Sequence, residues 1–202
     1  MLKKLSATLV LVTCFWIGAC ANQKAPAEAA LKAAEDAVNA AAPEATKYVP
    51  EQWKAVTDGL AAAKDSFNKG DYKTALAGAQ DVAQKAKDAA AAAAAKKDQL
   101  VKAWNDMSAG VPGMVEAVKS RVDILSSSKK LPAGLDKAKL ESAKASLAAA
   151  SQAWGDASEA YKAGNVSDAT AKAGVAKDKA VEAMRTLGMS VPAAAATPAA
   201  GK

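Results

Sequence analysis

Reactive side chains are scarce in this chain of 202 residues, which contains two cysteines and no histidine. Without histidine, the chain lacks the usual general base, every histidine-based triad and histidine-containing zinc sites. Serine–lysine pairs and carboxylate pairs remain, but both residue types are scattered at the spacing of helix surfaces. We therefore expect no enzyme, no catalytic residue, no metal site and no cofactor.

The cysteine with an evident chemical role is Cys20, which follows a segment ordered like a secretory signal. Lys3 and Lys4 precede an apolar run over residues 9–17, and small residues come next. The run is too short to cross a bilayer as a helix, which takes about 20 residues. Residues 17–20, Ile-Gly-Ala-Cys, resemble the lipobox of bacterial lipoproteins. That resemblance implies removal of residues 1–19 and acylation of the Cys20 thiol.

Cysteine usage agrees with this interpretation. Cys14 would leave with the signal, and a lone thiol in an oxidising compartment is unusual unless it is modified. Stable anchoring takes more than one acyl chain, and a lipoprotein cysteine carries a diacylglyceryl group and usually an N-acyl chain such as palmitate. The alternative is ordinary cleavage at the Ala-Cys-Ala of residues 19–21, which would release a soluble protein.

The residue after the cysteine bears on location. Ala21 stands where an aspartate would, in the enterobacterial pattern, retain a lipoprotein at the inner membrane. We therefore expect a lipid-anchored protein of the cell envelope, at the outer membrane and facing the periplasm if the cell is Gram-negative.

Charge is weakly basic and interspersed. The 27 Lys and Arg residues face 21 Asp and Glu residues, which gives a formal net charge of +6. No basic patch with interleaved aromatic residues indicates nucleic-acid binding. Lysines could attract anionic lipid or a cell-wall polymer, although solvated helix faces are the commoner explanation.

The composition and the positions of proline and glycine predict an all-α chain. Alanine, the strongest helix former, fills 56 of the 202 positions. Proline and glycine then divide the chain, and residues 110–113, Gly-Val-Pro-Gly, are expected to end a long helix. The predicted helices cover about 27–42, 50–70, 71–108, 114–126, 136–163 and 165–187. They follow a linker over 20–26 and precede an Ala/Pro-rich tail over 189–202, which is expected to be disordered.

An internal repeat with an offset of 94 residues relates the two halves. Two apolar seams correspond: Trp53, Val56, Leu60, Ala63 and Phe67 match Leu147, Ala150, Trp154, Ala157 and Tyr161. In the turns, Gly70-Asp71 matches Gly164-Asn165, so glycine would supply the left-handed helix end and Asp or Asn would cap the next helix. We expect two copies of an antiparallel hairpin, over 50–90 and 136–187, in helical regions spanning 27–110 and 111–188. Together they would form a bundle or an elongated helical body.

Four aromatic residues are candidate contacts for a partner or ligand: Trp53, Trp104, Trp154 and Tyr161. At seam spacing, such side chains more often pack against a neighbouring helix than line a groove. Trp104 is different because it lies far along the third predicted helix, beyond the expected hairpin partner. If any aromatic residue is exposed for a partner, we expect it to be Trp104.

Residues 48–51, Tyr-Val-Pro-Glu, and the later Gly70-Asp71-Tyr72 with Ala75 resemble a domain of unknown function common in bacterial envelope lipoproteins. Its pattern is Y-A-P-E, a helix, G-D-Y-x-x-A and an alanine-rich helix, and the resemblance covers about residues 45–95. Some relatives carry an OmpA-like module, which this chain lacks, so peptidoglycan binding is not implied. The turn is also similar to that of a tetratricopeptide hairpin, but the interval of 94 argues against a continuous superhelix.

Two functional hypotheses follow. The first is a non-enzymatic, membrane-anchored scaffold that holds or spaces envelope proteins, or that forms a homo-oligomer. The second is a periplasmic carrier or sensor that binds a small apolar or anionic ligand between the hairpins, with Trp53 and Trp154 as symmetric aromatic residues.

Overall fold

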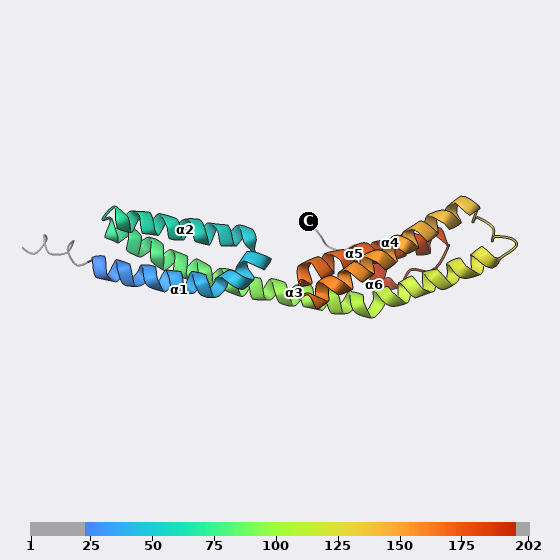
Figure 1. Ribbon diagram of the computed structural model, residues 1–202, viewed down its shortest axis with the longest axis horizontal. Helices are drawn as coiled ribbons and strands as arrows, with labels where there is room; N and C mark the ends of the chain where they lie inside the picture. Colours follow the sequence, from blue (N-terminus) through green and yellow to red (C-terminus); the bar gives the residue numbers. More distant parts are fainter. Residues whose placement is uncertain (1–22, 197–202) are drawn as a thin grey trace, which may run out of the picture. The chain divides into compact units, whose positions relative to one another are not determined.

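The computed structural model describes residues 23–196, and every regular element in that range is a helix (Figure 1). The predicted all-α fold class is therefore confirmed. The elements are α1 (Lys24–Tyr48), α2 (Pro50–Asn68), α3 (Tyr72–Ser127), α4 (Lys137–Lys162), α5 (Val166–Thr186) and the short α6 (Ala193–Ala196).

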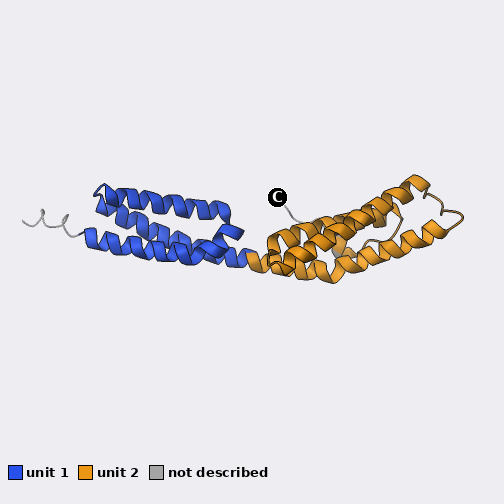
Figure 2. Ribbon diagram, in the orientation of Figure 1, with its two compact units in different colours: residues 1–96 blue, residues 97–202 orange. Residues whose placement is uncertain are grey.

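The chain divides into two compact units, residues 1–96 and residues 97–202 (Figure 2). The division falls inside α3, whose first part belongs to unit 1 and whose second part belongs to unit 2. The sequence had suggested a boundary at residues 110 and 111 instead. Each unit has its own core.

Unit 1 packs α1, α2 and the first part of α3 around an alanine-rich core. Its buried residues recur at alternating intervals of three and four, so each helix presents one continuous seam. In α1 the seam is Ala27, Leu31, Ala34, Val38, Ala41, Ala45 and Tyr48; in α3 it is Ala75, Ala79, Val82, Ala86, Ala89 and Ala93. Most of these side chains are single methyl groups, which let helix backbones approach closely.

Unit 2 packs the second part of α3 against α4 and α5. Larger side chains fill its main core, including Met114, Val118 and Leu125 of α3 and Leu140 of α4. The segment after α5 also contributes, because Met189 and Val191 pack against this core. An aromatic cluster around Trp104 forms a second, smaller core in the same unit.

The turn after α2 and the turn after α4 have the same geometry. Gly70 and Gly164 have φ of 81° and 75°, in the left-handed region that glycine adopts without a Cβ penalty. Each helix ends in a Schellman motif, in which the N–H groups of residues 71 and 165 donate to carbonyls five residues earlier. The Asp71 and Asn165 side chains then accept from the N–H groups of Thr74 and Asp168. The predicted glycine and cap roles are confirmed.

Residues that are related by the repeat offset of 94 positions are buried alike. The three matched alanine pairs, at 75 and 169, 79 and 173, and 86 and 180, are all 0% exposed. Val56 and its counterpart Ala150 are also buried, as are Ala63 and Ala157. The same sequence positions therefore face the core of each unit.

The predicted helix end at residues 110–113 is wrong, because α3 continues through Gly-Val-Pro-Gly to Ser127. Pro112 is exposed, so its ring faces solvent. Because proline has no N–H, the carbonyl four residues earlier lacks its helical donor, and this carbonyl is on the same outer side of the helix. Its neighbours Val111 and Met114 are buried, 2% and 6% exposed. Packing of the apolar seam on both sides of the proline stabilises the helical path. The helix predicted over 114–126 is thus part of α3.

Two further boundaries differ from the prediction. The first helix does not stop at Pro43 but extends to Tyr48, again with the proline on the exposed side and Ala45 and Tyr48 buried. The tail predicted to be disordered from Met189 contains α6, and residues up to Ala195 pack against the core of unit 2. Residues 197–202 lie outside the described range.

Candidate functional site

Cys20, the predicted lipidation site, lies outside the described residues, as does the whole predicted signal of residues 1–19. The described chain begins at Gln23, and α1 begins at Lys24. Among the helices of residues 23–196, none is both long enough and apolar enough to cross a membrane.

Three of the four candidate aromatic residues meet in unit 2. Trp104 of α3 stacks on Trp154 of α4, with ring centroids 5.4 Å apart and planes 4° apart. Trp104 also stacks on Tyr161, with ring centroids 4.4 Å apart and planes 9° apart. Trp154 and Tyr161 are seven residues apart, a rise of about 10.5 Å along a helix. That spacing leaves room for one inserted ring, so α4 holds the Trp104 indole between its own two aromatic residues.

The expectation that Trp104 is exposed is therefore wrong. Only 7% of Trp104 is exposed, and it packs with Ala157 of α4 and with Ala169 and Ala173 of α5. The Thr170 hydroxyl of α5 shares its proton between the Val166 carbonyl of its own helix, at 2.7 Å, and the Leu100 carbonyl of α3, at 3.3 Å. The hairpin beyond residue 110 covers the face of α3 that the sequence left without a partner.

Trp53 belongs to the other unit. It is 9% exposed and packs in the core of unit 1. By the offset of 94, its counterpart is Leu147, whereas Trp154 corresponds to Leu60. Trp53 and Trp154 thus occupy different positions of the repeat and do not form the symmetric pair that the carrier hypothesis assumed.

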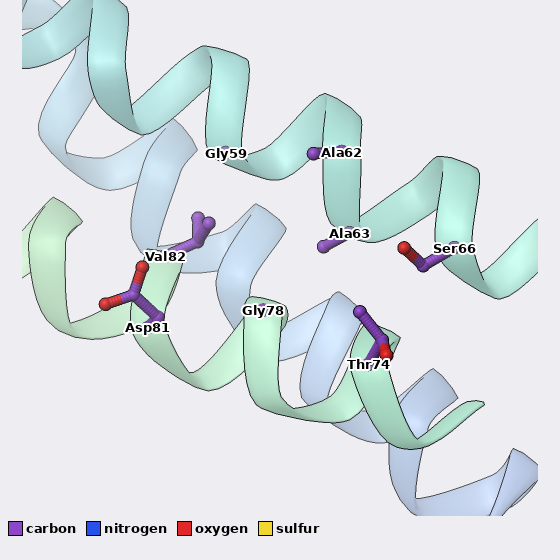
Figure 3. A pocket seen from close by; sticks show the side chains of 8 residues that line it. All are labelled: Gly59, Ala62, Ala63, Ser66, Thr74, Gly78, Asp81 and Val82. Atoms are coloured by element: carbon purple, nitrogen blue, oxygen red, sulfur yellow. The ribbon is translucent and has the colours of Figure 1, made fainter. Parts of the chain in front are cut away.

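A groove between α2 and α3 has the form of a shallow binding site (Figure 3). Its volume is about 220 Å³, and it is lined by Gly59, Ala62, Ala63, Ser66, Thr74, Gly78, Asp81 and Val82. Asp81 is the one charged lining residue, and its carboxylate pairs with Lys85 at 2.7 Å. The groove therefore offers small apolar contacts and two hydroxyl groups.

The two glycines of the groove let α2 and α3 pack closely. A Cβ on Gly78 would lie 3.2 Å from the Cβ of Ala63, and one on Gly59 would lie 3.0 Å from Val82 Cγ2. Their counterparts in the second copy, Ala153 and Lys172, both carry side chains. Glycine here is explained by helix packing, so the groove itself does not indicate a ligand.

Ionisable groups with shifted pKa values belong to helix caps and surface ion pairs. Hydrogen bonds from the Thr74 side chain and backbone lower the pKa of Asp71, the cap of α3. Lys179 lowers the pKa of Glu182, which also accepts from the buried Ser146. Asp168 raises the pKa of Lys172. These shifts accompany structural contacts and do not pair an acid with a base across a cavity.

Within residues 23–196, no group of three or more His, Cys, Asp or Glu side chains is arranged to hold a metal ion. Comparison with known proteins found no matching family model, no similar curated protein and no similar solved structure. The resemblance to envelope lipoproteins thus remains a prediction from the motifs.

Proposed function

We propose that this protein is a non-enzymatic, lipid-anchored scaffold of the bacterial envelope, which holds or spaces partner proteins through its helical surfaces. The observation that supports a scaffold over a ligand carrier is the aromatic stack. The rings of Trp104, Trp154 and Tyr161 contact one another, and Trp53 lies in a core. The large aromatic surfaces that could have held a ligand are engaged in helix packing.

The predicted membrane attachment supports the same proposal. A lipid on Cys20 would hold the chain at a bilayer, and α1 begins four residues later at Lys24. The start of α1 would then lie close to the membrane surface, where other envelope proteins are within reach.

Site-specific photo-crosslinking in intact cells tests the scaffold. A photoreactive residue would replace exposed side chains one at a time, for example Lys54 in unit 1 and Lys162 in unit 2. Discrete crosslinked proteins at particular positions are expected. The matched control places the same residue at Ala79, which is 0% exposed and should give no intermolecular product. Recovery of the monomer alone at every exposed position would contradict the proposal.

A bound small molecule would favour the carrier instead. Native mass spectrometry of protein purified from its own host measures this directly. We expect the mass of the acylated chain alone, and a stoichiometric additional mass would support a carrier.

A further inference from the structure

Four lysines are concentrated where α3 connects to α4. Lys129 and Lys130 lie in the connecting segment, and Lys137 and Lys139 lie in the first turn of α4. All four are exposed, and we call them the basic tip. The only acidic residue within 128–139 is Asp136, whose carboxylate is engaged as the helix cap, 2.8 Å from the Lys139 N–H. Figure 2 shows this connection at one end of unit 2.

The position of Lys137 and Lys139 does not serve helix stability. The N-terminus of a helix carries a partial positive charge, so cations in its first turn are unfavourable. The first turn of α4 contains no acidic residue, as in α1 and α3, whereas α2 has Glu51 and α5 has Asp168 in the first turn. The local electrostatics of α4 therefore leave these lysines unexplained.

The basic tip also lacks internal counter-charges. Some lysines elsewhere in unit 2 pair with acids, as in Lys144 with Glu141 and Lys179 with Glu182. Among the described residues, no salt bridge involves a lysine of the basic tip, and the Lys139 ammonium donates to the neutral carbonyl of Gly134 at 2.7 Å. Residues 187–196, which pack against the same core as the connection, carry no charge at all.

An exposed aliphatic side chain precedes the basic tip by five residues in the sequence. Ile124, in the last turn of α3, is 56% exposed. Cations beside an exposed aliphatic side chain are suited to the interface of a bilayer, where lysines meet lipid phosphates and the aliphatic group contacts acyl chains.

We propose that the basic tip docks unit 2 on a bilayer surface that contains anionic phospholipid. Charge complementarity carries the assignment: four unpaired cations in twelve residues attract a surface of negative headgroups. That such a bilayer is near rests on the proposed lipid anchor, but the attraction itself does not depend on it.

Co-sedimentation with vesicles tests the proposal. Residues 21–202, which retain every described helix and lack the predicted signal and the lipid, would be mixed with phosphatidylglycerol–phosphatidylcholine vesicles or with phosphatidylcholine vesicles. A lysine near such a surface contributes roughly five-fold in affinity. Replacement of all four lysines of the basic tip by glutamine should therefore weaken binding to the anionic vesicles by at least about 50-fold. Added salt should weaken binding of the unmodified chain.

The matched control replaces four exposed lysines of α3 by glutamine, which makes the same change in net charge. These lysines are Lys73, Lys87, Lys96 and Lys102. We expect it to bind nearly as well as the unmodified chain, and circular dichroism would show that both variants keep their helices. Equal losses in the two variants, or equal binding to neutral vesicles, would overturn the proposal. The test protein, residues 21–202, carries no lipid. Failure of this experiment would therefore not bear on the proposed anchor, and failure of the anchor would not change the result of this experiment.

Discussion

Trp104 shows how one side chain can be surrounded by residues distant in the sequence. Its indole lies between two aromatic rings of α4, more than 45 positions along the chain, and under three alanine methyl groups of α4 and α5. Stacked aromatic pairs contribute about 0.5–1.5 kcal/mol beyond the area that they bury. The residue therefore has a large part in joining α3 to the α4–α5 pair.

Replacing Trp104 by alanine should lower the free energy of unfolding by about 3–5 kcal/mol, the usual cost of removing a buried tryptophan. Urea titration followed by circular dichroism measures the change. The control is Val175→Ala, which trims a side chain that is 53% exposed and should change stability by less than about 0.5 kcal/mol. Equal stability of the two variants would mean that the stack does not hold unit 2 together.

Gly78 is constrained by close packing, because the neighbouring Ala63 Cβ is fixed to its backbone and cannot rotate away. Gly78→Ala and Gly155→Ala should gain the same helix propensity, but nothing lies within 4 Å of a Cβ at Gly155. We expect Gly78→Ala to be less stable than Gly155→Ala by about 1–3 kcal/mol, the cost of overpacking. Paired thermal melts would compare the two, and equal melting temperatures would show that α2 and α3 have room for the methyl group.

Among the elements, α3 departs most from its local sequence signals. Two glycines and a proline within four residues ordinarily end a helix, yet residues 110–113 continue it. The buried seam at Trp104, Val111, Met114, Val118, Val122 and Leu125 keeps a helical period across the interruption. Tertiary packing of this face outweighs the weak helix propensity of residues 110–113.

A continuous α3 makes a specific prediction for Gly110 and Gly113. Both are helical, neither has a positive φ, and a Cβ on either would meet nothing within 4 Å. Alanine at each position should therefore raise stability by about 0.5–1 kcal/mol. The contrasting variant is Gly70→Ala, where φ is 81° and a left-handed alanine should cost about 1–2 kcal/mol. Destabilisation by alanine at Gly110 and Gly113 would instead place a helix end there.

At the scale of the whole molecule, the proposed anchor would determine where the helical surfaces act. Acylation of Cys20 would attach the N-terminal end of unit 1 to a bilayer, and unit 2 carries the basic tip that we propose meets anionic lipid. An anchor and a second electrostatic contact would together bind the chain more firmly than either contact alone.

Replacing Cys20 by alanine should move the protein from the membrane fraction to the soluble fraction, and incorporation of labelled fatty acid should disappear. Cell fractionation with metabolic lipid labelling measures both. Ala19→Ser is the control, because it alters the cleavage region with a small residue and leaves the thiol in place. Unchanged lipid labelling in the Cys20→Ala variant would rule out acylation at this residue.

The sequence by itself was sufficient for the helical class, the two glycine turns with their Asp71 and Asn165 caps, and the buried register of the repeat. These features depend on residues within a few positions of one another, where propensity, capping and spacing act directly. Spacing also showed which side chains share a helix face.

What covers each face was decided only by the tertiary structure. Trp104 was expected to be exposed because its partners lie more than 45 residues away and no local pattern names them. The helix was expected to stop at residues 110–113 because the burial that stabilises it comes from α4 and α5. Of the candidate aromatic residues, the structure brought together Trp104, Trp154 and Tyr161 and placed Trp53 in a separate core. Such choices depend on the net free energy of long-range packing, which a single sequence does not display.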